Sequence, residues 1–401
     1  MGSGGAAPGG GAVTVGGGRS NGALRVSVDV SAVPSEPAGA GRYTLDLVAT
    51  LAGRDDLVLH LIARAGDEDR WTAMGPAVTV HAEVPRPRPL RLAWEQARLP
   101  QLLSRLAVDV HHSPHYTMPE SADVPRVVTV HDLTFYDHPE WHQRSKVAVF
   151  RRAIRVAARH AEGLVCVSEA TARRLARVCG YRGDMRVIPH GVALDRFRPA
   201  EQVPAADDEA TLAALGVRRP YVGFVGTLEP RKDVPTLVRA FDRVAAAHGD
   251  LLLVLAGTGG WGTEAVEAAI ASATHGDRVL RPGYVPDEVV PALLRQAAAV
   301  AYPSLEEGFG IPALEALACG APLVTTKGSA MEEVAGGAAL LFPPGDAAAL
   351  AGALDMLVRG DASLDVRRRR GLAIAARYTW PASASAHVEL YRAVAAKGRA
   401  T

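Results

Sequence analysis

The sequence alternates short runs rich in β-branched residues with longer helical stretches, and this alternation constrains the fold more than any other feature. It is typical of open parallel sheets whose faces are covered by crossover helices. The pattern occurs twice, on either side of a polar, acidic, proline-containing segment at residues 199–214. The predicted strands are 24–30, 57–63, 78–84, 126–132, 163–168 and 185–191 before this segment, and 221–227, 251–257, 278–285, 297–304, 321–326 and 338–344 after it.

The length of the chain also favours two domains, because 401 residues exceed one ordinary hydrophobic core. We expect an α/β protein with two similar halves, residues 23–198 and 215–379, joined by a linker at 199–214. A helix over 380–398 could pack on either half. Residues 1–22 are Gly-rich and lack the apolar centre of a signal peptide, so we expect a disordered lead-in.

Composition excludes several classes of function. The formal net charge is +1, so nothing in the overall charge indicates a nucleic-acid partner. The three cysteines, Cys166, Cys179 and Cys319, are widely spaced and odd in number, which fits a reducing compartment and no metal-ligand motif. No apolar run approaches the ~18 residues of a membrane span. These features predict a cytoplasmic protein.

Two predicted helices, 86–106 and 142–160, carry basic residues beside apolar ones. One interpretation is the solvated face of a packed helix. The other is contact with anionic lipid head groups at the inner face of the membrane.

The segment from Glu307 to Glu315, EGFGIPALE, is the most specific motif. It places two carboxylates and free backbone N–H groups around one concavity, and such groups bind hydroxyls and anions. We expect Glu315 in the first turn of a helix and Phe309 exposed. Capping of the helix alone would not explain the glycines, Gly308 and Gly310.

A second motif, GTLEPRKD, joins a strand to a helix. Gly226 permits a tight turn, and Asp233 can cap the helix. Arg231 and Lys232 are adjacent at the helix entrance, where two cations and the positive helix end would bind a diphosphate.

Further candidates follow the predicted strands of the first half. His131 and Asp132 end a strand, where ligands of parallel sheets bind, and His131 could hold a sugar hydroxyl or a leaving phosphate. Gly39 and Gly41 form a glycine turn before a helix. Three histidines within 111–115 lie in an expected loop without zincin spacing, so we predict no metal site.

The run Gly257–Gly262, GTGGWG, matches a dinucleotide-binding fingerprint and would suit an NAD-dependent oxidoreductase. A strand–helix unit at 221–247 precedes it, whereas the fingerprint normally follows the first strand of its domain. We interpret it as a turn. The oxidoreductase and a non-catalytic sugar-binding protein remain the alternatives.

Together these segments resemble glycosyltransferase family 4, the retaining nucleotide-sugar transferases of GT-B fold, over about residues 24–395. The resemblance rests on GAGRYT, DVHHSPHYTMP, VTVHDLTF, VSEAT, VIPHGVALDRF, GTLEPRKD and the E-x₇-E segment. It implies two Rossmann-like domains facing a central cleft, with the acceptor bound by the N-terminal one and the donor by the C-terminal one. Within the family the chain looks closest to mannosyltransferase-like enzymes of bacterial polysaccharide assembly.

The resemblance also implies roles for individual residues. Arg231 and Lys232 would hold the donor diphosphate, Glu315 the ribose hydroxyls, and Glu307 the hydroxyls of the transferred sugar. The reacting bond would lie beside His131. The remaining donor-binding residues would be Gly41, Gly226, Phe309, Gly310 and Ile311, and the cleft would be bordered by Gly39, Asp132, Ser168 and Glu169.

The implied reaction moves a hexose from a nucleoside-diphosphate sugar, GDP-mannose or a UDP-sugar, to an acceptor hydroxyl. The acceptor would be a glycan, a lipid-linked oligosaccharide or a small molecule. The resemblance implies no cofactor and no divalent metal, because Arg231, Lys232 and a helix N-terminus would stabilise the leaving group.

Overall fold

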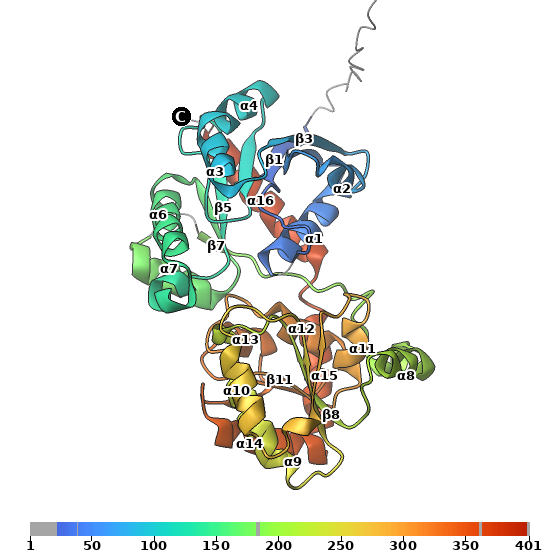
Figure 1. Ribbon diagram of the computed structural model, residues 1–401. Helices are drawn as coiled ribbons and strands as arrows, with labels where there is room; N and C mark the ends of the chain where they lie inside the picture. Colours follow the sequence, from blue (N-terminus) through green and yellow to red (C-terminus); the bar gives the residue numbers. More distant parts are fainter. Residues whose placement is uncertain (1–21, 38, 182–184, 361–362, 399–401) are drawn as a thin grey trace, which may run out of the picture.

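The computed structural model describes residues 22–37, 39–181, 185–360 and 363–398. It contains two parallel sheets of seven and six strands, each covered by helices, in two bodies that lie one above the other in Figure 1. The expected fold class is confirmed. Apart from Gly22, the Gly-rich lead-in lies outside the described residues.

The N-terminal half is built on a parallel sheet with the order β3-β2-β1-β4-β5-β6-β7. Helices cover both faces, so side chains such as Val26, Val127 and Val128 are fully buried. The strands are β1 Leu24–Asp29, β2 Leu57–Arg64, β3 Val78–Val84, β4 Val110–Ser113, β5 Arg126–Val130, β6 Gly163–Cys166 and β7 Met185–Val187. The helices are α1 Ala40–Ala52, α2 Glu68–Thr72, α3 Arg88–Ala97, α4 Leu99–Leu106, α5 Thr134–Asp137, α6 Arg144–His160 and α7 Glu169–Cys179.

The C-terminal half has a sheet with the order β10-β9-β8-β11-β12-β13, also parallel throughout. The strands are β8 Tyr221–Val225, β9 Leu252–Ala256, β10 Val279–Gly283, β11 Ala299–Tyr302, β12 Leu323–Thr326 and β13 Leu340–Phe342. The helices are α8 Ala205–Ala214, α9 Val234–Ala245, α10 Glu264–Ser272, α11 Val290–Arg295, α12 Ile311–Ala318, α13 Ala330–Ala335, α14 Ala347–Arg359 and α15 Leu364–Ala375.

The last helix, α16 (Trp380–Gly398), returns to the N-terminal half and packs on its sheet. Leu390 and Val394 lie against Gly163, where an added Cβ would come within 3.1 Å of the Val394 side chain. In Figure 1 this red helix runs among the blue elements of the opposite end of the sequence.

Two local expectations differ from the structure. Residues 110–113 form strand β4 instead of a loop, and the buried rings of His111 and His112 bond to hydroxyls of Ser27 and Thr129. The basic segment 86–106 forms two helices, α3 and α4, that meet at Arg98, because Pro100 cannot continue the hydrogen bonding of α3.

The expected linker also contains ordered structure. Helix α8 occupies its second part, and Asp208 of α8 pairs with Arg295 of α11 through two contacts of 2.6 and 2.7 Å. The chain passes between the halves elsewhere, along 188–198 and again just before α16. These two crossings touch, since the Val192 N–H donates to the Tyr378 carbonyl at 2.9 Å.

None of the helices in the described ranges is both long and apolar enough to cross a bilayer.

Candidate active site

A cavity of about 660 Å³ lies between the two halves, a volume typical of small-molecule sites. Its walls come from the loops that follow strands of both sheets, including β5, β8, β9 and β11. The carboxyl ends of both parallel sheets therefore meet at one cleft, which is where ligands of such sheets bind.

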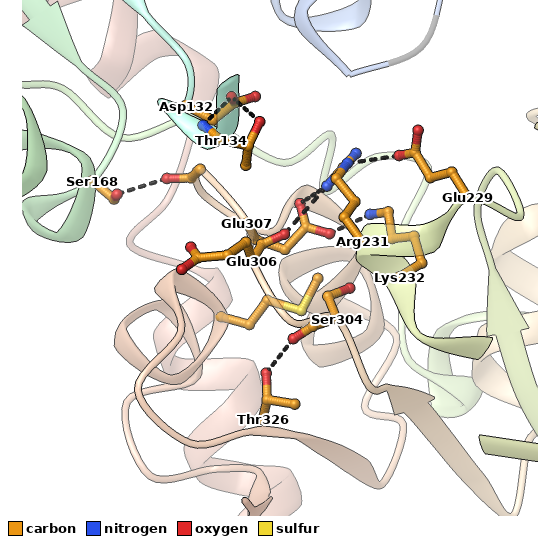
Figure 2. Close-up of polar contacts among 12 residues, drawn as sticks. Asp132, Thr134, Ser168, Glu229, Arg231, Lys232, Ser304, Glu306, Glu307 and Thr326 are labelled. Carbon is orange, nitrogen blue, oxygen red and sulfur yellow. Dashed lines mark hydrogen bonds and ion pairs between the residues drawn. The ribbon is translucent and has the colours of Figure 1, made fainter. Parts of the chain in front are cut away.

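Four charged side chains form a compact group on the C-terminal wall (Figure 2). The Arg231 guanidinium contacts Glu307 Oε2 at 2.8 Å and Glu229 at 2.7 Å, and Lys232 Nζ pairs with Glu307 Oε1. Burial disfavours ionisation of Glu307, but Arg231 and Lys232 outweigh it and lower the pKa of this carboxyl to about 2. The pKa of Lys232 is lowered by burial and by Arg231, against the effect of Glu307. Glu307 is therefore a carboxylate at any physiological pH.

The order of the strands brings this group together. Arg231 and Lys232 lie in a 3₁₀ turn, Pro230–Lys232, after β8, and Glu307 lies in the loop after β11. Strands β8 and β11 are neighbours in the sheet. A backbone hydrogen bond of 2.8 Å from Leu305 N–H to the Arg231 carbonyl fixes one loop to the other. The two motifs predicted from sequence thus form a single site.

Glu315 lies at the same cavity but in a different environment. Helix α12 begins at Ile311, so Glu315 is in its second turn and the expected first-turn position was wrong. Burial raises the pKa of Glu315 to about 7, while Arg42 and Arg196 act in the opposite direction. This carboxyl gains and loses its proton near neutral pH.

Phe309 is buried, with only 4% of its surface exposed, so the expectation of an exposed ring was also wrong. Its ring packs edge-to-face on His190 at a centroid distance of 4.7 Å. The packing of this ring anchors the loop, and residues 308–311 line the cavity.

His131 lies on the N-terminal wall, and its hydrogen bond defines its tautomer. Nε2 is 3.0 Å from the Pro114 carbonyl, which can only accept, so Nε2 carries the proton. Burial lowers the pKa of His131, which keeps the ring neutral. The other ring nitrogen, Nδ1, is then an acceptor. This geometry suits a sugar hydroxyl better than a phosphate oxygen.

The other predicted residues divide into two groups. Gly39, Asp132, Gly226, Gly310 and Ile311 line the cavity, whereas Gly41, Ser168 and Glu169 do not. Gly41 instead packs beneath the preceding loop, where an added Cβ would lie 3.2 Å from Pro34 and Pro37. Ser168 and Glu169 lie where the two halves touch.

Several cavity residues were not predicted. His190 is 4% exposed, lies beside His131 and Phe309, and has a buried Nδ1 atom without a hydrogen-bond partner. Its segment, VIPHG, could have indicated it. Arg42 forms a 2.8 Å ion pair with Asp287 across the two halves, and nothing in the local sequence of either residue indicates this contact.

Within the described residues, one group has the geometry of a possible metal site: Asp29, Glu95 and His115. These side chains already have partners. His115 Nε2 lies 3.1 Å from Asp29, and Glu95 accepts from Thr117 at 2.6 Å and from Gln96 at 2.9 Å. These contacts explain the cluster without an ion, so the absence of a metal requirement stays a prediction.

The run Gly257–Gly262 has a steric role. A Cβ at Gly257 would lie 2.1 Å from the Gly226 carbonyl, so glycine allows the loops after β8 and β9 to touch. Gly257 and Thr258 line the same cavity as Glu307. The run is part of the site described above and does not indicate a separate dinucleotide site.

Comparison with known proteins defines the class. The family described as "Glycosyltransferase Family 4" matches residues 37–196, and that described as "Glycosyl transferases group 1" matches residues 219–359. The solved sucrose-phosphate synthase of Thermosynechococcus elongatus has a TM-score of 0.75 at 20% identity, covering 93% of this chain and all of that one. HepE of Anabaena in complex with UDP and glucose has a TM-score of 0.72 at 20% identity, covering 92% and 100%. The chain is a glycosyltransferase of the GT-B type.

The sequence relatives are more specific. The phosphatidyl-myo-inositol mannosyltransferase of Mycobacterium leprae is 30% identical over 69% of each chain. The O-antigen chain mannosyltransferase B of Escherichia coli is 28% identical over 71% of this chain and 74% of the relative. The D-inositol 3-phosphate glycosyltransferase of Corynebacterium jeikeium is 35% identical over 52% and 51%. This chain belongs to glycosyltransferase family 4.

Proposed function

We propose that the protein transfers a hexose from a nucleoside-diphosphate sugar to an acceptor hydroxyl with retention of configuration at the anomeric carbon. The observation that carries this proposal is the buried contact of Glu307 with both Arg231 and Lys232 on the wall of the interdomain cavity. This contact joins two cations, which would bind a diphosphate, to a carboxylate, which would bind sugar hydroxyls. Glu315 supplies a second acceptor of hydroxyls on the same wall.

Donor binding would redistribute these contacts. With Glu229 included, the four side chains carry two positive and two negative charges, so the group is neutral without a ligand. The diphosphate oxygens would take over hydrogen bonds of Arg231 and Lys232, since both cations also attract phosphate. This would free lone pairs of Glu307 to accept hydroxyls of the transferred sugar.

The cations would then promote departure of the nucleoside diphosphate. Negative charge develops on the leaving phosphate in the transition state, and preorganised cations in a water-poor site stabilise it. The acceptor hydroxyl would attack the anomeric carbon from the side that the leaving group vacates, and its proton would pass to an oxygen of the departing phosphate. The Glu307 carboxylate would stabilise positive charge on the sugar ring, and His131 Nδ1 would accept a sugar hydroxyl. No metal ion is required for these steps.

For the donor we propose a mannose nucleotide first, and GDP-mannose in particular. The support is that two of the relatives above are named mannosyltransferases. A UDP-sugar is the alternative, since HepE of Anabaena was also solved in complex with UDP-glucose. Thermal-shift measurements with GDP, UDP and their sugars would decide, because a ligand that binds only the folded state raises the melting temperature.

For the acceptor we propose a hydroxyl of a glycan, a lipid-linked oligosaccharide or a small molecule. Contact with an anionic membrane through the basic helices is a weaker proposal. Arg151 of α6 bonds to the carbonyls of Phe135 and Tyr136, and Arg152 pairs with Glu120. These two arginines therefore contribute to packing of the protein.

Substitution of the charged group tests the proposed reaction. Glu307→Ala and Lys232→Ala should each lower sugar transfer at least about 100-fold, the usual effect of losing one stabilising group in such a site. Radiolabelled sugar transfer measures the rate, and NMR of the product measures the anomeric configuration. Glu264→Ala, an exposed carboxylate on α10, is the control. Full transfer by both site variants, or an inverted product, would contradict the proposal.

A further inference from the structure

The carbonyl of Gly308 receives two hydrogen bonds from the opposite half of the molecule. Ser168 Oγ donates to it at 2.6 Å and Thr171 Oγ1 at 3.0 Å. Figure 2 shows the Ser168 bond beside the charged group. Ser168 Oγ also accepts the Thr171 N–H at 3.1 Å as the N-cap of α7. Both lone pairs of one loop carbonyl are thus bound by hydroxyls from the N-terminal half.

Other contacts hold the start of α7 to the same region. The Glu333 carboxylate of α13 accepts the N–H groups of Glu169 at 2.8 Å and Ala170 at 3.0 Å. These are first-turn N–H groups that have no partner within the helix. Arg174 of α7 pairs with Glu306 at 2.7 Å. The N-terminal turns of α7 therefore contact the C-terminal half at residues 306, 308 and 333.

Gly308 also touches the end of β5. A Cβ at this position would lie 1.7 Å from the His131 carbonyl oxygen, so only glycine permits the approach. The loop therefore lies between two segments of the N-terminal half, one after β5 and one at the start of α7. Its other side is held within the C-terminal half, where the preceding residue, Glu307, pairs with Arg231 and Lys232.

We propose that Ser168 and Thr171 are positioning residues for Glu307. By holding the Gly308 carbonyl, they place the adjacent Glu307 carboxylate where the transferred sugar binds. It follows that the loop at residues 305–310 is fully ordered only when the two halves are close enough for α7 to contact it. This inference rests on the proposed function for its effect on turnover, but the contact itself is tested separately.

Kinetics tests the positioning role. Thr171→Val removes one hydroxyl with little change in shape, and Ser168→Asp keeps an N-cap acceptor but cannot donate to Gly308. We expect kcat to fall about five- to tenfold in Thr171→Val and further in Ser168→Asp. The Kd of UDP and GDP should change less than about twofold, because the proposed nucleotide ligands Arg231, Lys232 and Glu315 belong to the C-terminal half.

Two variants serve as controls. Thr171→Ser keeps the hydroxyl and should restore most of kcat. Thr211→Val removes a hydroxyl on α8 that bonds only to its own helix, and it should leave kcat unchanged. Unchanged kcat in both Thr171→Val and Ser168→Asp would overturn the proposal, as would an equal loss of kcat and of nucleotide affinity.

Hydrogen exchange tests the contact without turnover. The amides of residues 305–310 should exchange faster in Thr171→Val and Ser168→Asp than in the wild type, while those of the α9 core remain protected. Unchanged exchange at 305–310 in both variants would overturn the proposal. If the wild type transferred no sugar from any donor, the proposed function would fail, but the exchange result would still decide whether α7 orders this loop.

Discussion

At the scale of single residues, two buried carboxyls in one loop–helix segment have opposite protonation behaviour. Burial alone favours the protonated form of both Glu307 and Glu315. Glu307 lies against two cations, which reverse the shift, whereas Glu315 has only more distant arginines and its pKa remains near 7. The position of neighbouring charges decides which side chain stays ionised.

The raised pKa of Glu315 predicts pH-dependent nucleotide binding. If the carboxylate form binds the ribose hydroxyls, affinity for UDP or GDP should fall about tenfold from pH 8 to pH 6, as the fraction ionised around a pKa of about 7 falls by that factor. Calorimetric titration measures this. Glu315→Gln should show only the titration of the nucleotide's own phosphate, and an equal pH dependence in both proteins would contradict the assignment.

Stability without nucleotide should show the linked effect. The native carboxyl of Glu315 binds a proton more tightly than in the unfolded chain, whose ordinary pKa is 4.5. Its contribution to the free energy of unfolding is therefore fully present below about pH 4.5 and is lost as the pH rises to about 7. Urea unfolding across this range should show a smaller decrease in Glu315→Gln. The reverse change would contradict the raised pKa.

At the scale of elements, the helix α16 could be predicted from sequence, but the half of the molecule on which it packs could not. Two of its side chains belong to a buried hydrogen-bond network. The Tyr391 hydroxyl lies 2.7 Å from His112 Nδ1, and His387 Nε2 lies 2.8 Å from the Tyr43 hydroxyl. The partners lie on β4 and α1, far away in the sequence. The helix follows from local periodicity, but its docking depends on contacts with the other end of the chain.

Loss of one network hydroxyl should therefore destabilise the N-terminal half. Tyr391→Phe leaves the buried His112 Nδ1 without its partner and should cost about 1–3 kcal/mol. Differential scanning calorimetry should show a lower melting temperature. Tyr284→Phe is the control, because that residue is 60% exposed. Equal stability of the two variants would show that the hydroxyl of Tyr391 contributes nothing.

At the scale of the whole molecule, the two halves approach closely at Gly308 and His131. The approach leaves no room for a Cβ. Gly308→Ala should therefore hold the halves slightly apart while each core stays folded. Displacement of a catalytic loop by about 1 Å typically costs about 100-fold in rate, and we expect a loss of that size.

Scattering and calorimetry test this prediction. Small-angle X-ray scattering with UDP should give a larger radius of gyration for Gly308→Ala than for the wild type, with nearly unchanged melting temperature. Gly249→Ala is the matched control, because a Cβ there meets no atom within 4 Å. A fully active, equally compact Gly308→Ala protein would contradict the closed arrangement.

Much of this architecture could be predicted from sequence. Runs of valine, leucine and isoleucine predicted twelve of the thirteen strands in the described part of the chain, in parallel α/β order, because strands buried on both faces need continuous apolar residues. Strand β4 was missed since its centre is His111 and His112, whose polar rings are satisfied by hydroxyls of other strands. Glu315 was expected in the first turn of α12 but lies in the second, because the helix already begins at Ile311, directly after Gly310.

The sequence by itself determined the class of protein and the residues that could bind a diphosphate and sugar hydroxyls, because these depend on chemical type and local spacing. Only the tertiary structure decided that Glu307 pairs with Arg231 and Lys232, that Glu315 titrates near pH 7, and that α7 reaches Gly308. Each of these depends on strand order or on closure of two halves. Such contacts join residues far apart in the chain, and the local sequence does not indicate which of these residues come close in space.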